Sequence, residues 1–318
     1  MIDETYRRHI VGLLAHGSVV RADFTPESDI DMVVVVDTDE APPRQYSDGY
    51  LFIYDYFFLT RNDLASADFV LSDPHFGTVL KEGVILFDPT GVLAKAKALA
   101  EEKHDLPEYK RRRATAQLAE TERFLDAMLD AYDKRDKDQF YVQYYLFGYR
   151  LMSIPLIANC VAYSGKRGFS YLEKTLEDSQ WSFLVTSVAS ALNVEPMPEV
   201  RFPEILAALE EAVAAYSKLR SASDSSVLSF RDFISGLQRV ISEELERDSL
   251  WNCFAVASAV DRTAHELPPA DRSKLHTTLQ EVYHAMRIES WDGIEQTVER
   301  CKPCVSEMRR YCQEFSKD

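Results

Sequence analysis

Residues 16–36 read HGSVVRADFTPESDIDMVVVV, and this stretch decides the fold that we expect. The apolar run at residues 10–15 predicts a buried strand before it. Residues 32–36 predict a second strand, because they are strongly apolar and mostly β-branched. Asp29 and Asp31 stand at the head of this second strand. The stretch therefore predicts a strand, a glycine–serine loop and a second strand that begins with two acids.

The spacing of the acids indicates a metal site. Asp29 and Asp31 are two residues apart, which puts both carboxylates on one face of a strand, roughly 6.6 Å apart along the chain. A divalent cation removes the repulsion between them, and hard carboxylate oxygens suit Mg²⁺. Asp55 is the only charged residue in residues 50–59, which predict a third strand. Since a lone acid there is costly unless it is paired or bound to metal, we expect Asp55 to join the other two.

The loop between the first two strands opens with Gly17 and Ser18. A glycine lets the backbone approach a phosphate where a Cβ would obstruct it. The serine adds a hydroxyl donor beside backbone N–H groups that can point at an anion. Arg21 follows in the same loop, where it either contacts a phosphate or is a solvated arginine. These residues predict a phosphate-binding loop next to the acids.

The rest of the chain divides into two parts of different character. Residues 84–87 predict a fourth strand, and residues 40–49 predict a loop because of their prolines and glycine. Thr60 is a candidate N-cap for a following helix. From about residue 107 the apolar residues recur at helical spacing, and we expect no strand after residue 87. The fold class expected is α+β: a small domain with a mixed sheet and flanking helices, then an all-α helical bundle.

The order of these residues resembles the nucleotidyltransferase superfamily, which includes polymerase β-like enzymes and aminoglycoside adenylyltransferases. Its pattern is a Gly-Ser pair after a strand, a short spacer, an acid–hydrophobic–acid motif and a third acid on a later strand. Here the spacer between Ser18 and Asp29 has ten residues and ends in a Pro-Glu-Ser lead-in at residues 26–28. One departure is that few residues precede the first strand, so we expect the helix that often stands there to be short or absent.

The resemblance implies a polymerase β-like nucleotidyltransferase catalytic domain at residues 1–105 and an all-helical substrate-binding domain at residues 106–318. It implies attack by a hydroxyl on the α-phosphate of ATP or another NTP, with pyrophosphate leaving and two Mg²⁺ ions assisting. The implied metal ligands are Asp29 and Asp31 for both ions and Asp55 for the ion that activates the nucleophile. The implied nucleotide-binding residues are Gly17, Ser18, Arg21 and Ser28.

The formal net charge of −16 bears on the partners. A field of this sign repels nucleic-acid backbones, so we do not expect a nucleic-acid partner. The same field attracts a cationic small molecule, although it could equally be solubility charge. No apolar run approaches the roughly 18 residues of a membrane span, and the start lacks a signal-peptide layout. We therefore expect a cytoplasmic protein without a membrane partner.

The function expected is transfer of NMP, with AMP from ATP favoured, to a hydroxyl of a small-molecule acceptor. An aminoglycoside-like antibiotic is one such acceptor, and the activity would then confer antibiotic resistance. Two alternatives stay open: an antitoxin-like nucleotidyltransferase that modifies a partner protein, and a non-catalytic nucleotide-binding regulator. The tyrosine-rich residues 141–149 either line the acceptor site or pack in a core. The basic residues 110–113 either face the triphosphate or form a solvated helix face.

The five cysteines do not resemble a disulfide framework, because they are few and odd in number for a chain of 318 residues. Cys301 and Cys304 form a lone CxxC motif without a second pair or nearby histidines. We therefore expect reduced cysteines on a C-terminal helix.

Overall fold

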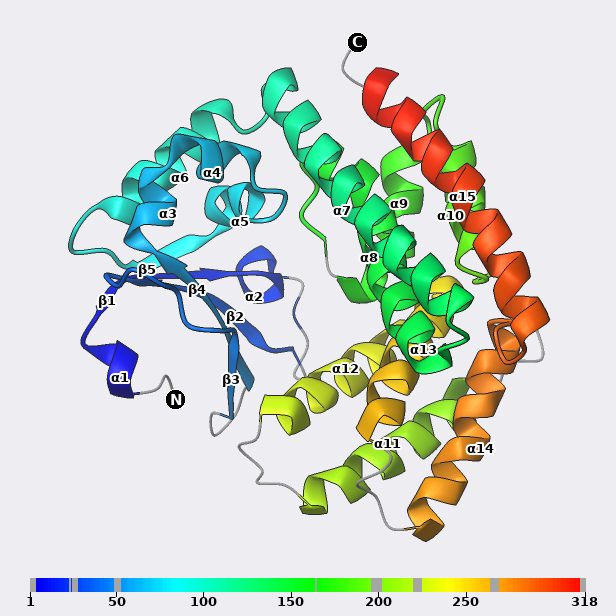
Figure 1. Ribbon diagram of the computed structural model, residues 1–318. Coiled ribbons are helices and arrows are strands. Elements are labelled where there is room, and N and C mark those ends of the chain that lie inside the picture. The colour runs from blue at the N-terminus through cyan, green and yellow to red at the C-terminus, as the bar shows by residue number, and fades with distance from the viewer. Residues whose placement is uncertain are drawn as a thin grey trace. The chain divides into compact units, whose positions relative to one another are not determined.

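The computed structural model describes residues 4–22, 24, 28–48, 53–163, 165–195, 202–219, 225–263 and 269–314. The chain separates into two compact units, which can be followed by chain colour in Figure 1. The first unit comprises Met1–Arg113, Ile157–Ala162 and Ala222–Asp232. The second comprises Ala114–Leu156, Tyr163–Ser221 and Phe233–Asp318. The assignment of a catalytic domain to residues 1–105 and a substrate-binding domain to residues 106–318 stays a prediction.

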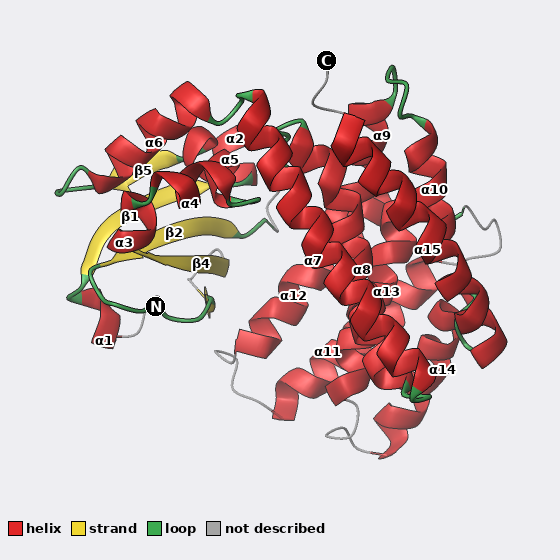
Figure 2. Cartoon of the chain, turned by 45° about the horizontal axis from the view of Figure 1, so that its top comes forward, coloured by secondary structure: helices red, strands yellow, loops and turns green. Residues whose placement is uncertain are grey.

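The first unit is built on a mixed sheet with the strand order β3-β4-β2-β1-β5, shown in yellow in Figure 2. The middle strand β2 pairs parallel with β4 and antiparallel with β1. The edge strands β3 and β5 pair antiparallel with β4 and β1. The strands are β1 (Ile10–His16), β2 (Ile30–Val36), β3 (Gln45–Asp48), β4 (Ile53–Thr60) and β5 (Val84–Phe87). This mixed sheet with flanking helices confirms the fold class expected for the N-terminal part.

A layer of helices packs on one face of this sheet and forms the main core of the unit. Leu14, Val33 and Leu59 of the strands share this core with Leu80 and Leu93 of the helices, all of them buried. The helices of the layer are α3 (Arg61–Ala65), α4 (Ala67–Ser72), α5 (Phe76–Glu82) and α6 (Val92–Lys103). Two single-turn helices, α1 (Glu4–Arg7) and α2 (Ser18–Arg21), precede β1 and β2. The short α1 agrees with the expected departure from the family pattern.

The change from sheet to helix at Thr60 has a clear local cause. The Thr60 hydroxyl accepts a hydrogen bond from the backbone N–H of Asp63, and the Asp63 carboxylate accepts one from the backbone N–H of Thr60. This reciprocal pair is a capping box, which satisfies two otherwise unpaired donors at the start of α3. The prediction of an N-cap at Thr60 is therefore confirmed.

The prediction of a loop over residues 40–49 is wrong in part, because residues 45–48 form the edge strand β3. Its residues Gln-Tyr-Ser-Asp show no apolar alternation that would reveal a strand. The strand forms because the edge of β4 offers unpaired backbone groups, and Gln45 lies opposite Tyr56 in the register. Tertiary pairing here overrides local sequence preference. Of the third predicted strand, residues 50–52 lie outside the described residues.

The second unit is helical throughout its described residues, as predicted for the C-terminal part. Its helices pack in pairs, with α10 against α15 and α11 against α13 and α14. Three helices are divided between the two units: α7 (Pro107–Asp133), α8 (Lys137–Ala158) and α12 (Ser225–Ser242). The others are a 3-10 turn (Gly165–Arg167), α9 (Gly168–Leu176), α10 (Phe183–Ala191), α11 (Phe202–Leu219), α13 (Glu246–Thr263), α14 (Pro269–Ala285) and α15 (Trp291–Glu314).

The tyrosines of α8 lie in the core of the second unit. Tyr141 and Tyr144 are buried, and their hydroxyl groups donate hydrogen bonds to the carbonyl oxygens of Ile288 and Ala191. The Tyr141 ring stacks on Tyr283 with 4.3 Å between ring centroids. Core packing, rather than a ligand-lining surface, therefore explains these two tyrosines.

The cysteines match the expectation of reduced thiols. All five are free, and Cys301 and Cys304 are buried on α15. Burial raises the pKa of the Cys304 thiol to about 12. No helix in the described part of the chain is long and apolar enough to cross a bilayer.

Candidate active site

Three carboxylates converge at one end of the sheet of the first unit. Asp29, Asp31 and Asp55 each place an oxygen within 4.8 Å of the other two. Asp29 and Asp31 are half-buried, whereas Asp55 is fully buried. The structure thus brings together the three acids that the sequence singled out.

The pairing of β2 with β4 explains why these acids meet. The two strands run parallel in register, and Asp31 lies directly opposite Asp55. Asp29 precedes Asp31 by two residues, so the alternation of a strand keeps it on the same face. Further along that face lie Val33 and Val35, which belong to the core under the helices. The acids therefore continue the helix-covered face of the sheet beyond the point where the apolar core ends.

The glycine–serine loop touches the acidic group. Gly17 has a φ of +77°, which disfavours any side chain, and a Cβ placed there would lie 2.1 Å from Oδ2 of Asp31. No real Cβ tolerates such a distance, so the backbone at Gly17 can pass the carboxylate only because the residue is glycine. Ser18 then begins the single-turn helix α2. The loop and the acids form one site.

Arg44 is a member of this site that the sequence did not indicate. Its Nε donates to Oδ1 of Asp55 over 2.8 Å, and its Nη2 donates to Oδ2 of the same carboxylate. The guanidinium also lies over the ring of Phe57, 4.1 Å from the ring centroid. Arg44 immediately precedes β3, the strand that was predicted to be a loop. Because β3 is not recognisable from the sequence, the position of Arg44 beside Asp55 is not recognisable from it either.

His16 is the second residue at the site without a predicted role. It ends β1 directly opposite Asp31, and its ring lies 6.0 Å from that of Phe57. Its Nε2 is buried without a hydrogen-bond partner among the described residues. Burial, assisted by the charges of Arg21 and Arg44, lowers the pKa of His16 to about 4. The imidazole is therefore neutral at physiological pH and offers one uncommitted nitrogen beside the acids.

The other predicted nucleotide-binding residues lie around the same loop. Arg21 is half-buried, with 26% of its side chain exposed, and its Nη1 lies 3.5 Å from Oε2 of Glu82. Ser18 and Ser28 are half-buried, and Ser28 directly precedes Asp29. Phosphate contacts by Gly17, Ser18, Arg21 and Ser28 stay predictions.

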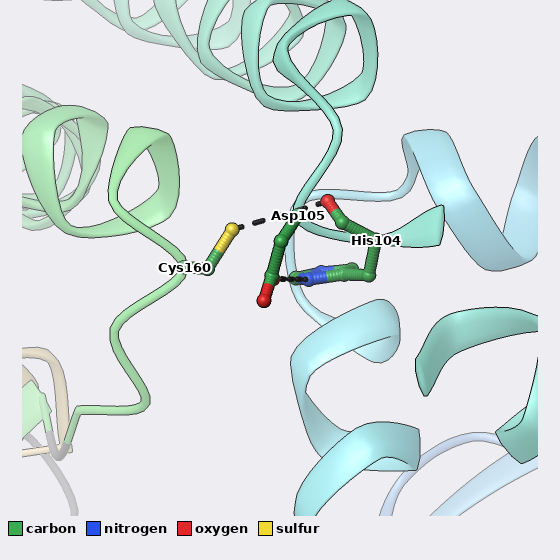
Figure 3. Close-up of side chains that lie close together, drawn as sticks. All are labelled: His104, Asp105 and Cys160. Carbon is green, nitrogen blue, oxygen red and sulfur yellow. Dashed lines mark hydrogen bonds and ion pairs between the residues drawn. The ribbon is translucent and has the colours of Figure 1, made fainter. Parts of the chain in front are cut away.

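A second group of metal-ligand side chains lies elsewhere in the first unit, at the end of α6 (Figure 3). It consists of His104, Asp105 and Cys160, again with ligand atoms within 4.8 Å of one another. However, the Nη2 of Arg113 lies 3.1 Å from the Cys160 sulfur, and the Lys81 ammonium pairs with Asp105. Two cations thus already occupy the positions that a metal would need. We therefore interpret this group as a set of structural contacts with Arg113 and Lys81, and not as a metal site.

The basic residues 110–113 do not behave as one surface. Arg111 and Arg112 are exposed, whereas Arg113 is fully buried. The Arg113 guanidinium donates to the carbonyl oxygens of Leu71 and His104 over 2.6 and 2.8 Å. The solvated-face alternative therefore holds for the exposed pair and is wrong for Arg113, which ties the helices of the first unit together.

Comparison with known families supports the geometry of the first unit. Residues 2–82 match the model of the nucleotidyltransferase domain. This part of the chain is therefore similar to a nucleotidyltransferase domain. The match includes the glycine–serine loop and all three aspartates, and covers about a quarter of the 318 residues. It leaves the helical second unit without a family assignment.

Comparisons over longer stretches add little. No curated protein is significantly similar to the chain. Among solved structures, the chain is similar to a nucleotidyltransferase-like protein from Exiguobacterium sibiricum, with 12% identity and a TM-score of 0.32. The similarity covers 77% of this chain and 73% of the other chain.

Proposed function

We propose that the protein is a divalent-metal-dependent nucleotidyltransferase, which transfers NMP from an NTP to a hydroxyl group, with ATP as the favoured donor. The observation that carries the proposal is the convergence of Asp29, Asp31 and Asp55 within 4.8 Å of one another, beside the loop at Gly17. The nucleotidyltransferase domain at residues 2–82 supports NMP transfer as the general reaction.

The three acids fit Mg²⁺ as donors. Carboxylate oxygens are the ligands that this ion prefers, and three of them converge here within 4.8 Å of one another. Asp29 and Asp31 would hold two ions and Asp55 one of them. When bound, Mg²⁺ polarises the α-phosphate and stabilises the attacking and leaving oxygens.

The protein's own residues would bind and orient the triphosphate. The bare backbone at Gly17 allows a phosphate to approach closely, and Ser18 offers its hydroxyl as a donor. Arg21 carries a positive charge close to this loop and Ser28 stands at the entry to the acids. Holding the β- and γ-phosphates in this way would leave the α-phosphate over the acids, in line for attack.

The acceptor proposed is a small cationic molecule with free hydroxyl groups, such as an aminoglycoside-like antibiotic. The net charge of −16 supports a cationic acceptor, because a negative field raises the local concentration of cations and their rate of association. Such an activity would confer antibiotic resistance.

The reaction is tested by mass spectrometry. The purified protein is incubated with Mg²⁺, one of the four NTPs and a panel of hydroxyl-bearing amines that includes aminoglycosides. We expect one acceptor to gain a nucleoside monophosphate, with release of pyrophosphate. Absence of a product from every aminoglycoside would contradict the antibiotic version, and labelling of a protein in a cell extract would favour the antitoxin-like alternative.

The site is tested with matched aspartate variants. Asp29→Ala and Asp31→Ala should lower turnover by orders of magnitude without unfolding the protein, because each removes a metal ligand. Asp37→Asn is the control, since Asp37 follows the opposite end of β2, is exposed and lies 3.9 Å from Arg61. Undiminished transfer by Asp29→Ala or Asp31→Ala would refute the assignment.

A further inference from the structure

The negative charge of Asp55 is balanced by the guanidinium of Arg44 within the first unit. Both of its carboxylate oxygens accept hydrogen bonds from the guanidinium of Arg44, one from Nε and one from Nη2. Because two N–H groups donate in parallel, this is a bidentate arginine–carboxylate pair, which is the strong form of the contact. Because Asp55 is fully buried, an unpaired charge there would be costly. Arg44 therefore supplies the positive charge that Asp55 needs when no metal ion is bound.

The arginine is held less firmly than the acid. Its side chain is 47% exposed, whereas that of Asp55 is 0% exposed. Its guanidinium lies over Phe57, which is two residues after Asp55 on β4. A half-exposed arginine on an aromatic ring can move into solvent, while the carboxylate stays fixed by the sheet. Any exchange of partners at Asp55 will therefore occur by movement of the arginine.

A divalent cation and this guanidinium compete for the same oxygens. Asp55 is the third acid of the group with Asp29 and Asp31, and an ion bound by all three must take a lone pair of Asp55. The guanidinium directs donors at both Asp55 oxygens, and two cations this close repel each other.

We propose that Arg44 is a built-in counter-ion that competes with the divalent metal for Asp55, and thereby sets the metal concentration at which the site fills. This inference rests on the proposed function, because it requires a metal at the three acids. Arg44 is a positioning residue in this scheme: its hydrogen bonds hold the Asp55 carboxylate in place until the metal displaces them.

The inference is tested by metal binding rather than by activity. Free Mn²⁺ is measured by electron paramagnetic resonance during titration of the full-length protein, without nucleotide. Arg44→Met should bind Mn²⁺ about tenfold more tightly than the wild type, because it removes both the competitor and a nearby positive charge. Arg44→Lys should show a smaller gain in Mn²⁺ affinity, because an ammonium group cannot make the bidentate contact with Asp55.

Two controls separate local competition from general charge. Arg61→Met removes an exposed arginine just after the far end of β4, roughly 20 Å along the strand from Asp55, and should change Mn²⁺ affinity less than about twofold. In an Asp55→Asn background, Arg44→Met should tighten binding much less than in the wild type, because only the removal of a nearby charge then contributes. Equal tightening by Arg61→Met, or an undiminished tenfold effect in Asp55→Asn, would overturn the inference.

The outcomes also distinguish this inference from the proposed function. If the wild type binds Mn²⁺, Asp31→Asn abolishes binding and Arg44→Met leaves it unchanged or weaker, the inference fails and the function stands. If neither the wild type nor Arg44→Met binds Mn²⁺, or if Asp31→Asn binds as well as the wild type, both fail. Should Arg44→Met not fold, Arg44→Lys carries the same test, and unchanged affinity in that variant counts against the competition.

Discussion

Gly17 and Asp31 lie so close together that the carboxylate of one fills the space where a Cβ of the other would be, 2.1 Å from Oδ2. This contact ties the geometry of the loop to the geometry of the acids. Gly17→Ala must therefore displace Asp31 or the loop, and it also forces an alanine to a φ of +77°. We expect Gly17→Ala to lose Mn²⁺ binding and nucleotide transfer while the protein stays folded, measured by Mn²⁺ titration and circular dichroism.

The chain offers a matched control for this variant. Gly91 has a similar φ of +71°, but nothing lies within 4 Å of a Cβ placed there. Gly91→Ala should cost about 1–2 kcal/mol, because its ψ of 14° puts it in the left-handed helical region, and it should have no effect on metal binding. If both variants lost metal binding, or if neither did, the contact between Gly17 and Asp31 would not be the cause.

Arg113 should contribute strongly to the stability of the first unit. It is fully buried and donates to the carbonyl oxygens of Leu71 and His104, with the Cys160 sulfur as a third acceptor. Arg113→Lys keeps the charge, but one ammonium cannot reach all three acceptors, so buried carbonyls lose their donors. We expect a loss of about 2–4 kcal/mol in the free energy of unfolding, measured by urea denaturation.

The neighbouring Arg112 provides the comparison. It is exposed and lies 3.2 Å from the exposed Asp68. An ion pair of this kind contributes little, so Arg112→Lys should change the free energy of unfolding by less than about 0.5 kcal/mol. Equal effects of the two substitutions would show that Arg113 does not act through its buried hydrogen bonds.

Asp248 should make the stability of the second unit depend on pH. Its Oδ1 accepts from the backbone N–H of Phe169 over 2.8 Å, and its Oδ2 accepts from that of Ser170 over 3.0 Å. Burial nevertheless raises the pKa of Asp248 to about 6, against a usual 3.8. The folded state therefore holds this proton more tightly than the unfolded state, so the stabilisation is present at low pH and is lost as pH rises through about 6.

The effect is isolated by comparison with Asp248→Asn, which cannot titrate. From pH 4.5 to pH 7, the free energy of unfolding of the wild type should fall relative to that of Asp248→Asn by about 2 kcal/mol. Urea denaturation at several pH values measures this difference directly. A difference that stays constant, or that grows with pH, would contradict the raised pKa.

The cysteines should resist modification in the folded protein. Burial raises the pKa values of Cys304 and Cys312 to about 12, and Cys253 and Cys301 are also buried with raised pKa values. Only Cys160 is half-buried. With a disulfide reagent at pH 8 we expect slow reaction that begins at Cys160, and release of five thiols only in denaturant. Rapid labelling of Cys301 or Cys304 would favour a reactive CxxC motif.

The sequence predicted those elements whose signal is local. The valine run at residues 33–36 and the apolar β5 are recognisable as strands. The cap formed by Thr60 and Asp63 can also be predicted, because its two residues are only three apart in the sequence. β3 was missed because only its pairing with β4 makes it a strand. Edge strands of this kind are specified by their neighbour and not by their own residues.

The same distinction applies to the site. Asp29, Asp31 and Gly17 could be predicted because they are close in sequence, and Asp55 because a lone acid in an apolar strand is conspicuous. Arg44 could not be predicted, because it comes close to Asp55 only when β3 pairs with β4 in the observed register. His16 directly precedes Gly17 in the sequence, but its buried Nε2, which has no hydrogen-bond partner among the described residues, is recognisable only once β1 is paired with β2.

Because β2 is the middle strand of the sheet, we expect its backbone hydrogen bonds to be the last in the first unit to break. Both of its edges are hydrogen-bonded, to β1 and to β4, and residues Met32 to Val36 are buried. Amide protons in such a strand exchange with solvent only when the sheet as a whole comes apart. The aspartates at its head are therefore anchored to the slowest-exchanging segment, and local fraying of the edge strands leaves their separation unchanged.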